Sequence, residues 1–226
     1  MDPRCCPVID ALPERERHRL LDRAVPRRLH RRQVLHLAGD RERRIHVVVD
    51  GLMKLAARDG SGNETLLGIA APGDLVGEIA AIDELQQPLD AIAATPCTVV
   101  GLDADCFVEI VARNPTATIE FARLLASRIR WVCDTAIERS AGDVPARLAG
   151  RLLDLADLLG RIEAGAVEFE MPLAQADLGS LAGMCRESAC KALRSFRAKG
   201  VVDYRGRRLR ILRPDVLEKI RCGARA

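Results

Sequence analysis

The chain has 226 residues, of which 48% are hydrophobic, 30% charged and 3% aromatic, so a folded protein with an aliphatic core is expected. No apolar run reaches the ~18 residues that span a bilayer, and the first residues lack a signal peptide's apolar stretch, which predicts a cytoplasmic protein with no membrane partner. Eight cysteines in such a compartment are expected to be thiols, metal ligands or redox sensors rather than disulfides.

The net charge of +3 is unevenly distributed along the chain. Residues 186–213 contain ten Lys and Arg against two acidic residues, a local charge of +8, while the rest of the chain carries −5. A basic block on a mildly acidic body is typical of a nucleic-acid-binding module, although a solvated charged face would have the same composition. The block coincides with a predicted helix and hairpin, which favours the nucleic-acid interpretation.

The N-terminal half is predicted to be a β-structure preceded by one helix, over residues 13–24. Residues 34–102 contain short β-prone runs separated by Gly and Asp, such as "RIHVVVDG" and "CTVVGLD". Such spacing indicates a compact antiparallel roll or barrel. The sequence "RDGSGN", residues 58–63, is a hairpin candidate because Asp and Gly tolerate the positive φ of tight turns.

A long helix is predicted to begin at Pro115, with Asn114 as its N-cap. Apolar and small side chains then recur at spacings of four and three, which is the heptad periodicity of helices that pack along each other. About 26 residues make a rod of roughly 40 Å. A bundle helix packed on its own domain is the alternative, but the narrow apolar stripe favours a dimer. The candidate dimer residues are Ala122, Leu125, Ile129, Val132 and Ala136.

The C-terminal part is predicted to contain helices and a small basic hairpin. Gly142 is expected to end the long helix and Asp143 to cap an amphipathic helix after it. A short strand over residues 167–171 leads to two helices separated by Gly183. Two strands around a turn at residues 205–206 follow, and this order of elements describes a winged helix-turn-helix.

The helix after Gly183 separates into two faces when residues are placed 100° apart. Arginine can donate two hydrogen bonds to guanine and glutamate can accept one from cytosine, so the polar face suits the DNA major groove. The polar face contains Arg186, Glu187, Cys190, Lys191, Arg194 and Arg197. The apolar face, expected to pack on the preceding helix, contains Cys185, Ala189, Ala192, Leu193 and Phe196.

Four segments carry a resemblance to the cyclic-AMP receptor/FNR (CRP/FNR) family of regulators. Residues 172–202, "PLAQADLGSLAGMCRESACKALRSFRAKGVV", resemble its helix-turn-helix, whose pattern runs Leu-Thr-Gln-x-Asp-Leu-Ala and then Gly-x-Ser-Arg-Glu-Thr-Val. "APGDLVGEIAAID" is similar to the family's turn within the β-roll, and "FARLLASRIRWV" lies where the family has its dimer helix. "VPARLAGRLLDLA" resembles the first helix of its DNA-binding domain. The resemblance covers about residues 13–217.

The resemblance implies an α+β fold with three parts. Residues 1–112 would form a double-stranded β-helix, the β-roll of cyclic-nucleotide-binding domains; residues 113–141 the dimerisation helix; and residues 142–226 the winged helix-turn-helix. It implies a homodimeric transcription regulator that binds double-stranded DNA at a near-palindromic operator, associates with the nucleoid when bound, and has RNA polymerase as a partner. The two recognition helices would enter major grooves about 34 Å apart.

Two other classes of function are less favoured by the sequence. An enzyme is not expected, because no Ser/His/Asp set, phosphate-binding Gly loop or zinc-ligand spacing is present. A ligand sensor whose helix-turn-helix contacts another protein is the second alternative, and the local charge of +8 argues against it.

Matched to the family's pattern, Arg186, Glu187 and Lys191 occupy base-contacting positions, and Lys191 stands where arginine is common. The resemblance places Gln175 at a phosphate, and the hairpin arginines are candidates for flanking phosphates, where they govern affinity rather than sequence choice. Cys185 replaces the serine that caps the recognition helix, which costs about 1 kcal/mol. The candidate DNA-binding residues are Gln175, Arg186, Glu187, Lys191, Arg194, Arg205, Arg207 and Arg208, with Arg210 as a further hairpin candidate.

In cyclic-nucleotide-binding members a Gly-Glu pair is followed by Arg and a small residue; the Glu takes the ribose hydroxyl and the Arg the phosphate. Here Asp90 stands in the later segment, and an anionic phosphate beside it would be repelled. We therefore expect no binding of cyclic AMP in that manner, no resident cofactor, and a structural role for Glu78. The residues at the corresponding positions of this degenerate effector pocket are Gly77, Glu78, Leu89, Asp90, Val132 and Cys133.

A redox or metal sensor is the alternative regulator. Iron–sulfur members of the family use N-terminal cysteines and one cysteine of the β-roll, and the matching residues would be Cys5, Cys6 and Cys97. A cluster needs four ligands, so Cys106 or Cys133 would have to complete the set. The spacing of the family's cluster is missing, and Cys97 is equally explained as a small buried residue. Haem ligation by His30, His36 or His46 is weaker still, because no spacing selects one of them.

Overall fold

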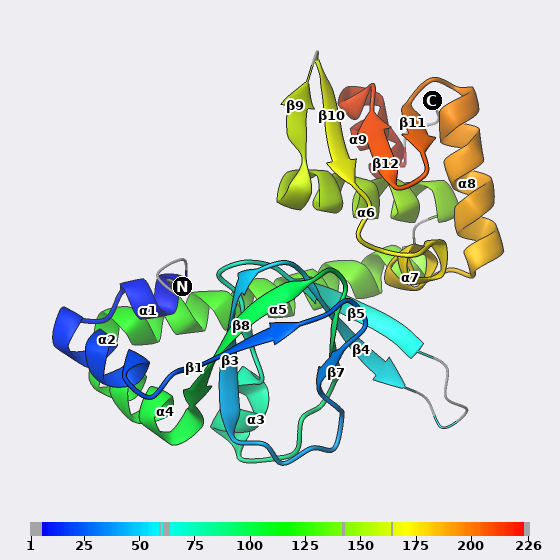
Figure 1. Ribbon diagram of the computed structural model, residues 1–226. Helices are drawn as coiled ribbons and strands as arrows, with labels where there is room; N and C mark the ends of the chain where they lie inside the picture. Colours follow the sequence, from blue (N-terminus) through cyan, green and yellow to red (C-terminus); the bar gives the residue numbers. More distant parts are fainter. Residues whose placement is uncertain (1–5, 59, 61–63, 142, 164, 224–226) are drawn as a thin grey trace. The chain divides into compact units, whose positions relative to one another are not determined.

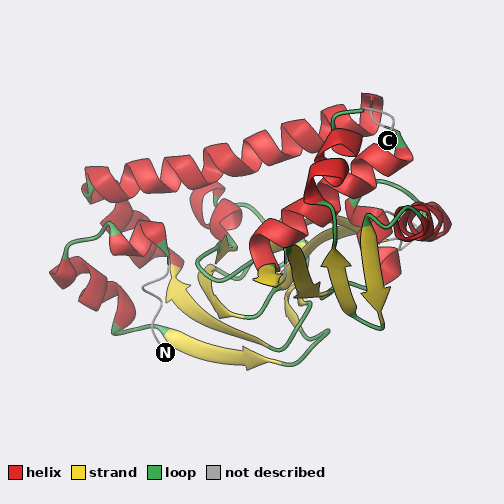
Figure 2. Cartoon of the chain, turned by 90° about the horizontal axis from the view of Figure 1, so that it is seen from above, coloured by secondary structure: helices red, strands yellow, loops and turns green. Residues whose placement is uncertain are grey.

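The structure is a computed structural model that describes residues 6–58, 60, 64–141, 143–163 and 165–223 (Figure 1). The chain divides into two compact units, residues 1–130 and 131–226, and the boundary falls inside helix α5 (Pro115–Ala141). This helix of 27 residues is the longest one in the cartoon of Figure 2. Within the described ranges, no helix has both the length and the hydropathy that crossing a bilayer requires.

The first unit is built on two four-stranded sheets in which every strand pair is antiparallel. The strand order is β1-β8-β3-β6 in one sheet and β2-β7-β4-β5 in the other. This arrangement confirms the predicted β-roll. The strands are β1 (Val25–Leu29), β2 (Val34–His36), β3 (Arg44–Asp50), β4 (Met53–Arg58), β5 (Glu64–Ala70), β6 (Leu75–Val76), β7 (Asp90–Ala93) and β8 (Cys97–Asp103).

The helices of this unit differ from the predicted ones in three places. The helix predicted over residues 13–24 is α2 (Glu14–Leu21), which is shorter because β1 begins at Val25; α1 (Pro7–Asp10) precedes it. Helix α3 (Glu78–Asp83) interrupts the region predicted to be all β, and its Ala-rich sequence favours a helix. Helix α4 (Ala104–Arg113) was not predicted; Asp103 caps it by accepting a hydrogen bond from the backbone N–H of Cys106 at 2.9 Å.

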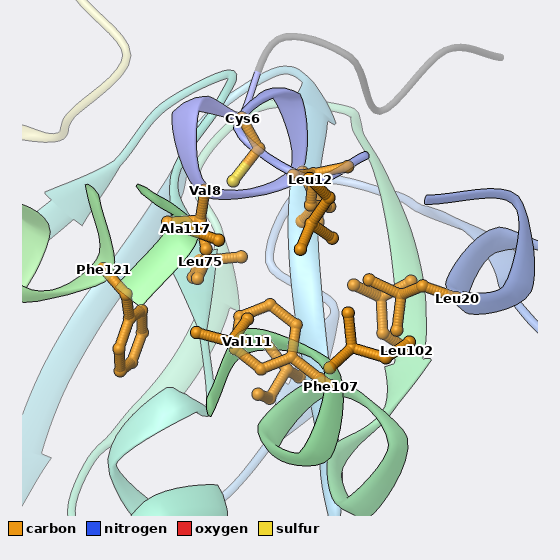
Figure 3. Packing of buried hydrophobic residues seen from close by; sticks show 14 of the residues in the cluster. Cys6, Val8, Leu12, Leu20, Leu75, Leu102, Phe107, Val111, Ala117 and Phe121 are labelled. Atoms are coloured by element: carbon orange, nitrogen blue, oxygen red, sulfur yellow. The ribbon is translucent and has the colours of Figure 1, made fainter. Parts of the chain in front are cut away.

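The central strands β3 and β8 of the sheet β1-β8-β3-β6 are buried on both faces, whereas the edge strand β1 is exposed up to its last residue, Leu29. Val100 and Leu102 of β8 pack into a cluster with α1, α2, α4 and α5, whereas Cys97 and Val99 pack into the cluster between the two sheets. Figure 3 shows the helical cluster, in which the rings of Phe107 and Phe121 meet edge to face at 5.8 Å between centroids. The first residues of α5 are thereby fixed to the roll.

The second unit contains the predicted winged helix-turn-helix with two additions at its ends. Its sheet has the antiparallel order β11-β12-β10-β9. Strand β9 and helix α9 were not predicted. The elements are α6 (Val144–Leu159), β9 (Arg161–Glu163), β10 (Ala166–Glu170), α7 (Gln175–Leu181), α8 (Arg186–Ala198), β11 (Val202–Arg205), β12 (Arg208–Ile211) and α9 (Pro214–Arg221).

Three predicted boundaries can be compared with the structure. Asp143 caps α6 as predicted, accepting from the N–H of Ala146 at 2.8 Å. Helix α5 begins at Pro115 as predicted, and the carbonyl of Asn114 accepts from the N–H of Thr118 at 2.9 Å, as that of an N-cap residue does. The side-chain amide of Asn114 instead donates to the carbonyl of Ile110 in α4 at 2.7 Å. Strands β4 and β5 pair antiparallel on either side of the predicted 58–63 hairpin, but Asp59, residues 61–63 and Gly142 lie outside the described residues.

Candidate DNA-binding surface and effector pocket

Helices α7 and α8 are joined by a tight turn that two glycines permit. Gly183 has φ +64°, and the N–H of Met184 donates to the carbonyl of Gly179 at 2.9 Å. A Cβ on Gly179 would lie 3.0 Å from the carbonyl oxygen of Met184, which is tighter than an ordinary contact, so glycine lets the turn pack closely on α7 without a shift. The turn fixes the direction of α8 relative to α7.

Helix α8 has one buried face and one exposed face, as its sequence predicts. Ala189, Ala192, Leu193 and Phe196 are 2–6% exposed and pack inside the unit. The polar side chains point to solvent, apart from the half-buried Cys190. The exposed polar residues are Arg186, Glu187, Lys191, Arg194 and Arg197.

Cys185 is the N-cap of α8 and is exposed, so its assignment to the apolar face was wrong. Position 185 precedes the first helical turn, and the helical spacing used for the prediction does not apply there. The Cys185 Sγ lies 3.2 Å from the hydroxyl of Ser188. Hydrogen bonds from the backbone N–H of Glu187 and from Cys185 lower the pKa of the Glu187 carboxyl, so it is an ionised acceptor at neutral pH.

Gln175 occupies the first position of α7 and is exposed. Its Oε1 accepts a hydrogen bond from the Cys190 thiol at 3.1 Å, which connects α7 to the exposed side of α8. The carboxylate of Asp177 accepts from the N–H of Ala174 at 3.1 Å and satisfies a free donor at the start of α7. Gln175 and Cys190 therefore form one edge of the polar surface.

The hairpin β11–β12 carries the predicted arginines, but three of them are paired with carboxylates of β10. Arg207 Nε lies 3.1 Å from Glu170, Arg210 Nε lies 3.2 Å from Glu168, and Arg208 also pairs with Glu168. The antiparallel register of β10 and β12 places Glu168 opposite Arg210. These carboxylates balance much of the charge that the sequence places in the hairpin.

Two further arginines differ in their surroundings. Arg205, at the end of β11, is exposed, and no carboxylate partner for it is found among the described residues. Arg197 of α8 pairs with Asp203 at 3.1 Å and stacks 4.9 Å above the ring of Tyr204. The side chain of Arg197 therefore packs against the hairpin. The polar side chains on the first two turns of α8 remain exposed.

The predicted effector pocket contains a buried carboxylate that the protein itself neutralises. Gly77, with φ +88°, starts α3, and the next residue, Glu78, is 2% exposed. Arg128 of α5 donates to the Glu78 carboxylate and to the carbonyl of Leu75. Glu78 is therefore part of an ion pair between α3 and α5, and it is more than the turn residue expected from the sequence.

A second buried carboxylate lies at Asp90, the first residue of β7. One oxygen accepts from the N–H of Ala38 at 2.8 Å, and the other lies 2.7 Å from Nε of Arg58 on β4. This cation is not apparent from the sequence around Asp90, because Arg58 belongs to a neighbouring strand. Leu89 is half buried.

Gln87 is a second missed residue of this pocket. It is 3% exposed, and its amide nitrogen would lie 3.2 Å from a Cβ on Gly77. A neutral amide thus lies against the Gly77 turn. The burial of Gln87 is visible only in the fold, and the segment "ELQQPLD" alone does not single it out.

Two buried histidines, His36 and His46, complete the polar interior of the roll. Burial lowers the pKa of both, and neighbouring His36 and Arg27 contribute to lowering that of His46 to about 4. Both imidazoles are therefore neutral at pH 7.

The His46 imidazole makes the folded state sensitive to acid. Because its pKa is lower in the folded chain than the ordinary 6.5, stability is retained above pH 6.5 and is lost as the pH falls towards 4. Between pH 7 and pH 5 we expect this group to lower the free energy of unfolding by about 1–2 kcal/mol. Urea unfolding at both pH values should show a smaller pH-dependent loss for His46→Leu than for the parent chain; equal losses would contradict the assignment.

The predicted dimer residues are mostly exposed along α5. Ile129 and Val132 are 65% and 58% exposed, and Ala122 and Ala136 are also exposed. Leu125 is half buried against the core of the first unit, so it serves the protomer's own packing. Cys133, predicted to line the effector pocket with Val132, is exposed.

The cysteines of the sensor alternative are separated in the structure. Cys6 is buried in the cluster of helices on the sheet, and Cys97 is buried in the cluster between the sheets. Burial and nearby Asp50 raise the pKa of Cys97 to about 11, so it stays a thiol at neutral pH. Cys5 lies outside the described residues, within which no group of three or more His, Cys, Asp or Glu could hold a metal ion.

Gly183 offers a test of the turn that positions α8. Alanine there must adopt a positive φ and would place its Cβ 2.7 Å from Nε of Arg139, so Gly183→Ala is expected to cost about 1–2 kcal/mol of stability or more. Gly200→Ala is the matched control: it has φ +66°, but no described atom lies within 4 Å of its Cβ position. Thermal unfolding should show the larger loss at Gly183; equal losses would mean that Arg139 does not constrain the turn.

The fold and the exposed face of α8 define a class of protein: a transcription regulator with a cyclic-nucleotide-binding type of roll and a helix-turn-helix. The family model "Cyclic nucleotide-binding domain" matches residues 26–114, and "Crp-like helix-turn-helix domain" matches residues 146–220. The chain is 31% identical over 169 residues to the "CRP-like cAMP-activated global transcriptional regulator" of Mycobacterium tuberculosis, covering 75% of each chain. The protein belongs to the CRP/FNR family, whose members bind DNA and are dimeric transcription regulators rather than enzymes.

Other relatives agree with this assignment. The chain is 27% identical to the "Anaerobic regulatory protein" of Haemophilus influenzae, over 84% of this chain and 75% of that one. A CRP-family transcriptional regulator of Thermus thermophilus superposes with a TM-score of 0.74 at 26% identity, over 88% of this chain and 97% of that one. FixK2 of Bradyrhizobium japonicum, at 17% identity and a TM-score of 0.78, shares the fold over 90% and 98% of the two chains.

Proposed function

We propose that the protein is a homodimer that binds a near-palindromic operator in a sequence-specific manner. The observation that carries this proposal is the exposed polar face of α8, whose opposite face is buried in the unit. Functionally, residues 1–112 form the roll, residues 113–141 the dimer helix and residues 142–226 the DNA-binding module. As a regulator, the dimer would exert its effect through RNA polymerase.

The residues of this surface divide into two roles. Arg186, Glu187 and Lys191 would contact base edges, since they are exposed on the first two turns of α8. Gln175 and Arg205 would contact phosphates on either side. The other proposed DNA contacts are Arg194, Arg207 and Arg208.

Selection of bound sequences from random duplexes tests the proposal. We expect an inverted repeat whose half-site centres lie about one turn of DNA, roughly 34 Å, apart. Enrichment of no motif, or of a single unrepeated half-site, would contradict it.

Independence from cyclic AMP is the second part of the proposal, and the pocket's charges support it. Of its two buried carboxylates, Glu78 is paired with Arg128 and Asp90 with Arg58. A nucleotide phosphate would bring a further negative charge next to Asp90 and would have to take Arg58 away from it. The residues present therefore do not fit an anionic ligand. The M. tuberculosis relative is named as cAMP-activated. This pocket would make the present protein differ from that relative in its response to cyclic AMP.

Cyclic AMP is accordingly expected to leave operator binding unchanged. Fluorescence anisotropy with the selected operator should give the same dissociation constant with and without millimolar cyclic AMP, and calorimetry should show no binding heat. An increase in operator affinity of about tenfold or more on adding the nucleotide would overturn this part of the proposal, while leaving DNA binding intact.

A further inference from the structure

The last turns of α5 lie in the same compact unit as the DNA-binding module and contact it through a buried arginine. Arg151 of α6 is 3% exposed. Its guanidinium pairs with the carboxylate of Glu138, lies 2.9 Å from that of Asp154, and stacks 5.5 Å from the ring of Trp131. Trp131 and Glu138 are seven residues apart, so they share one face of α5. Arg151 thus joins α6 to that face.

A second contact reaches the turn of the helix-turn-helix itself. Arg139 of α5 donates from its guanidinium to the carbonyl of Ser180, at the end of α7, at 3.4 Å. Its side chain also crosses Gly183, where a Cβ would lie within 2.7–3.2 Å of three Arg139 atoms. Arg147 of α6 in turn donates to the carbonyl of Arg139 at 3.3 Å. The end of α5 therefore touches both α6 and the turn from which α8 starts.

We propose that Arg139 and Arg151 are positioning residues that fix each recognition helix to the end of its dimer helix, and so set the half-site spacing that the dimer accepts. The inference rests on the proposed function, a dimer on two half-sites. Both contacts start from the last turns of α5, which lie in the same compact unit as α8, so they connect α8 to this end of the helix. Neither residue belongs to the exposed polar face of α8.

The two residues differ in what their removal does to the fold. Arg151 is buried between two carboxylates, so replacing it leaves Glu138 and Asp154 without their partner and lowers stability. Arg139 is exposed, and its replacement leaves the core of the unit intact. Arg139→Ala is therefore the variant of choice, and Arg139→Lys, which can still reach a carbonyl, is the conservative rescue.

Operators with altered spacing test the inference on the full-length chain. One inserted base pair increases the separation of the half-sites by about 3.4 Å and rotates one relative to the other by about 35° around the DNA axis. A rigid dimer then cannot bind both half-sites. The parent protein is expected to lose about tenfold or more in affinity on such an insertion. Arg139→Ala is expected to lose about threefold or less, Arg139→Lys to behave like the parent, and all three to bind a single half-site equally.

Arg123→Ala is the matched control, because it removes the same charge from an exposed position of α5 in the first unit, where Arg123 pairs only with Glu120 among the described contacts. It should keep the parent's spacing preference. A parent-like spacing penalty in Arg139→Ala would overturn the inference, as would weaker binding of that variant to a single half-site. Failure of the parent protein to distinguish operator from random DNA, or its being a monomer, would instead contradict the proposed function.

Discussion

Replacing Arg186 with alanine is expected to abolish sequence preference while leaving salt-sensitive binding to random DNA. The side chain is exposed at the first position of α8, where the proposed bidentate contact to guanine would contribute about 1–3 kcal/mol of discrimination. A dimer loses this contact twice, so affinity for the selected operator should fall by about a hundredfold or more. Anisotropy titrations on operator and scrambled duplexes measure the ratio of the two affinities.

The control for this experiment is Arg41→Ala, which removes one exposed arginine from the first unit and should leave both affinities nearly unchanged. The two duplexes should respond differently to Arg186→Ala, because phosphate contacts by other residues remain. Equal losses on operator and scrambled DNA at low salt would show that Arg186 contacts only the backbone.

Ile129→Glu is expected to convert the dimer into a folded monomer. Ile129 is 65% exposed in the protomer, so the charge is harmless to the single chain but would be buried without a partner between two α5 helices. Loss of the paired geometry should lower operator affinity by about 10²–10⁴-fold, since the two half-sites are then bound independently. Sedimentation velocity measures the mass, and circular dichroism verifies the retained fold.

Ser127→Glu is the matched control on the same helix. Ser127 is exposed and lies about 160° from Ile129 around α5, so the same charge there should leave the dimer intact. Dimers of Ile129→Glu at micromolar concentration would place the interface elsewhere. Monomers of both variants would point to a general effect of negative charge on this helix.

Local and periodic features were predictable from the sequence. The two faces of α8 follow from residue spacing alone, and Gly183 marks the turn because a positive φ favours glycine. The roll follows from short β-prone runs between turn residues. Short helices such as α3 and α4 were missed, since six to ten residues inside a β-rich region give little periodic signal.

Contacts between distant strands and helices were not predictable. The sequence predicts that Asp90 repels a phosphate, but the partner of Asp90, Arg58, is 32 residues away and adjacent only because β4 pairs with β7. Glu168 likewise meets Arg210 through the register of β10 and β12. Arg128 reaches Glu78 only because α5 packs on the roll. Periodicity within one element contains no information about these pairings.

The carboxylates of β10 would change what the basic hairpin contributes to the proposed DNA binding. An arginine that is already paired with Glu168 or Glu170 must give up that partner to bind a phosphate, so the contact is an exchange of one anion for another. Such an exchange liberates fewer condensed cations per arginine than a contact made by an unpaired side chain. The hairpin would then contribute little net affinity for phosphate. Complexes on the wrong sequence would therefore dissociate rapidly, and the dimer could continue to search the duplex.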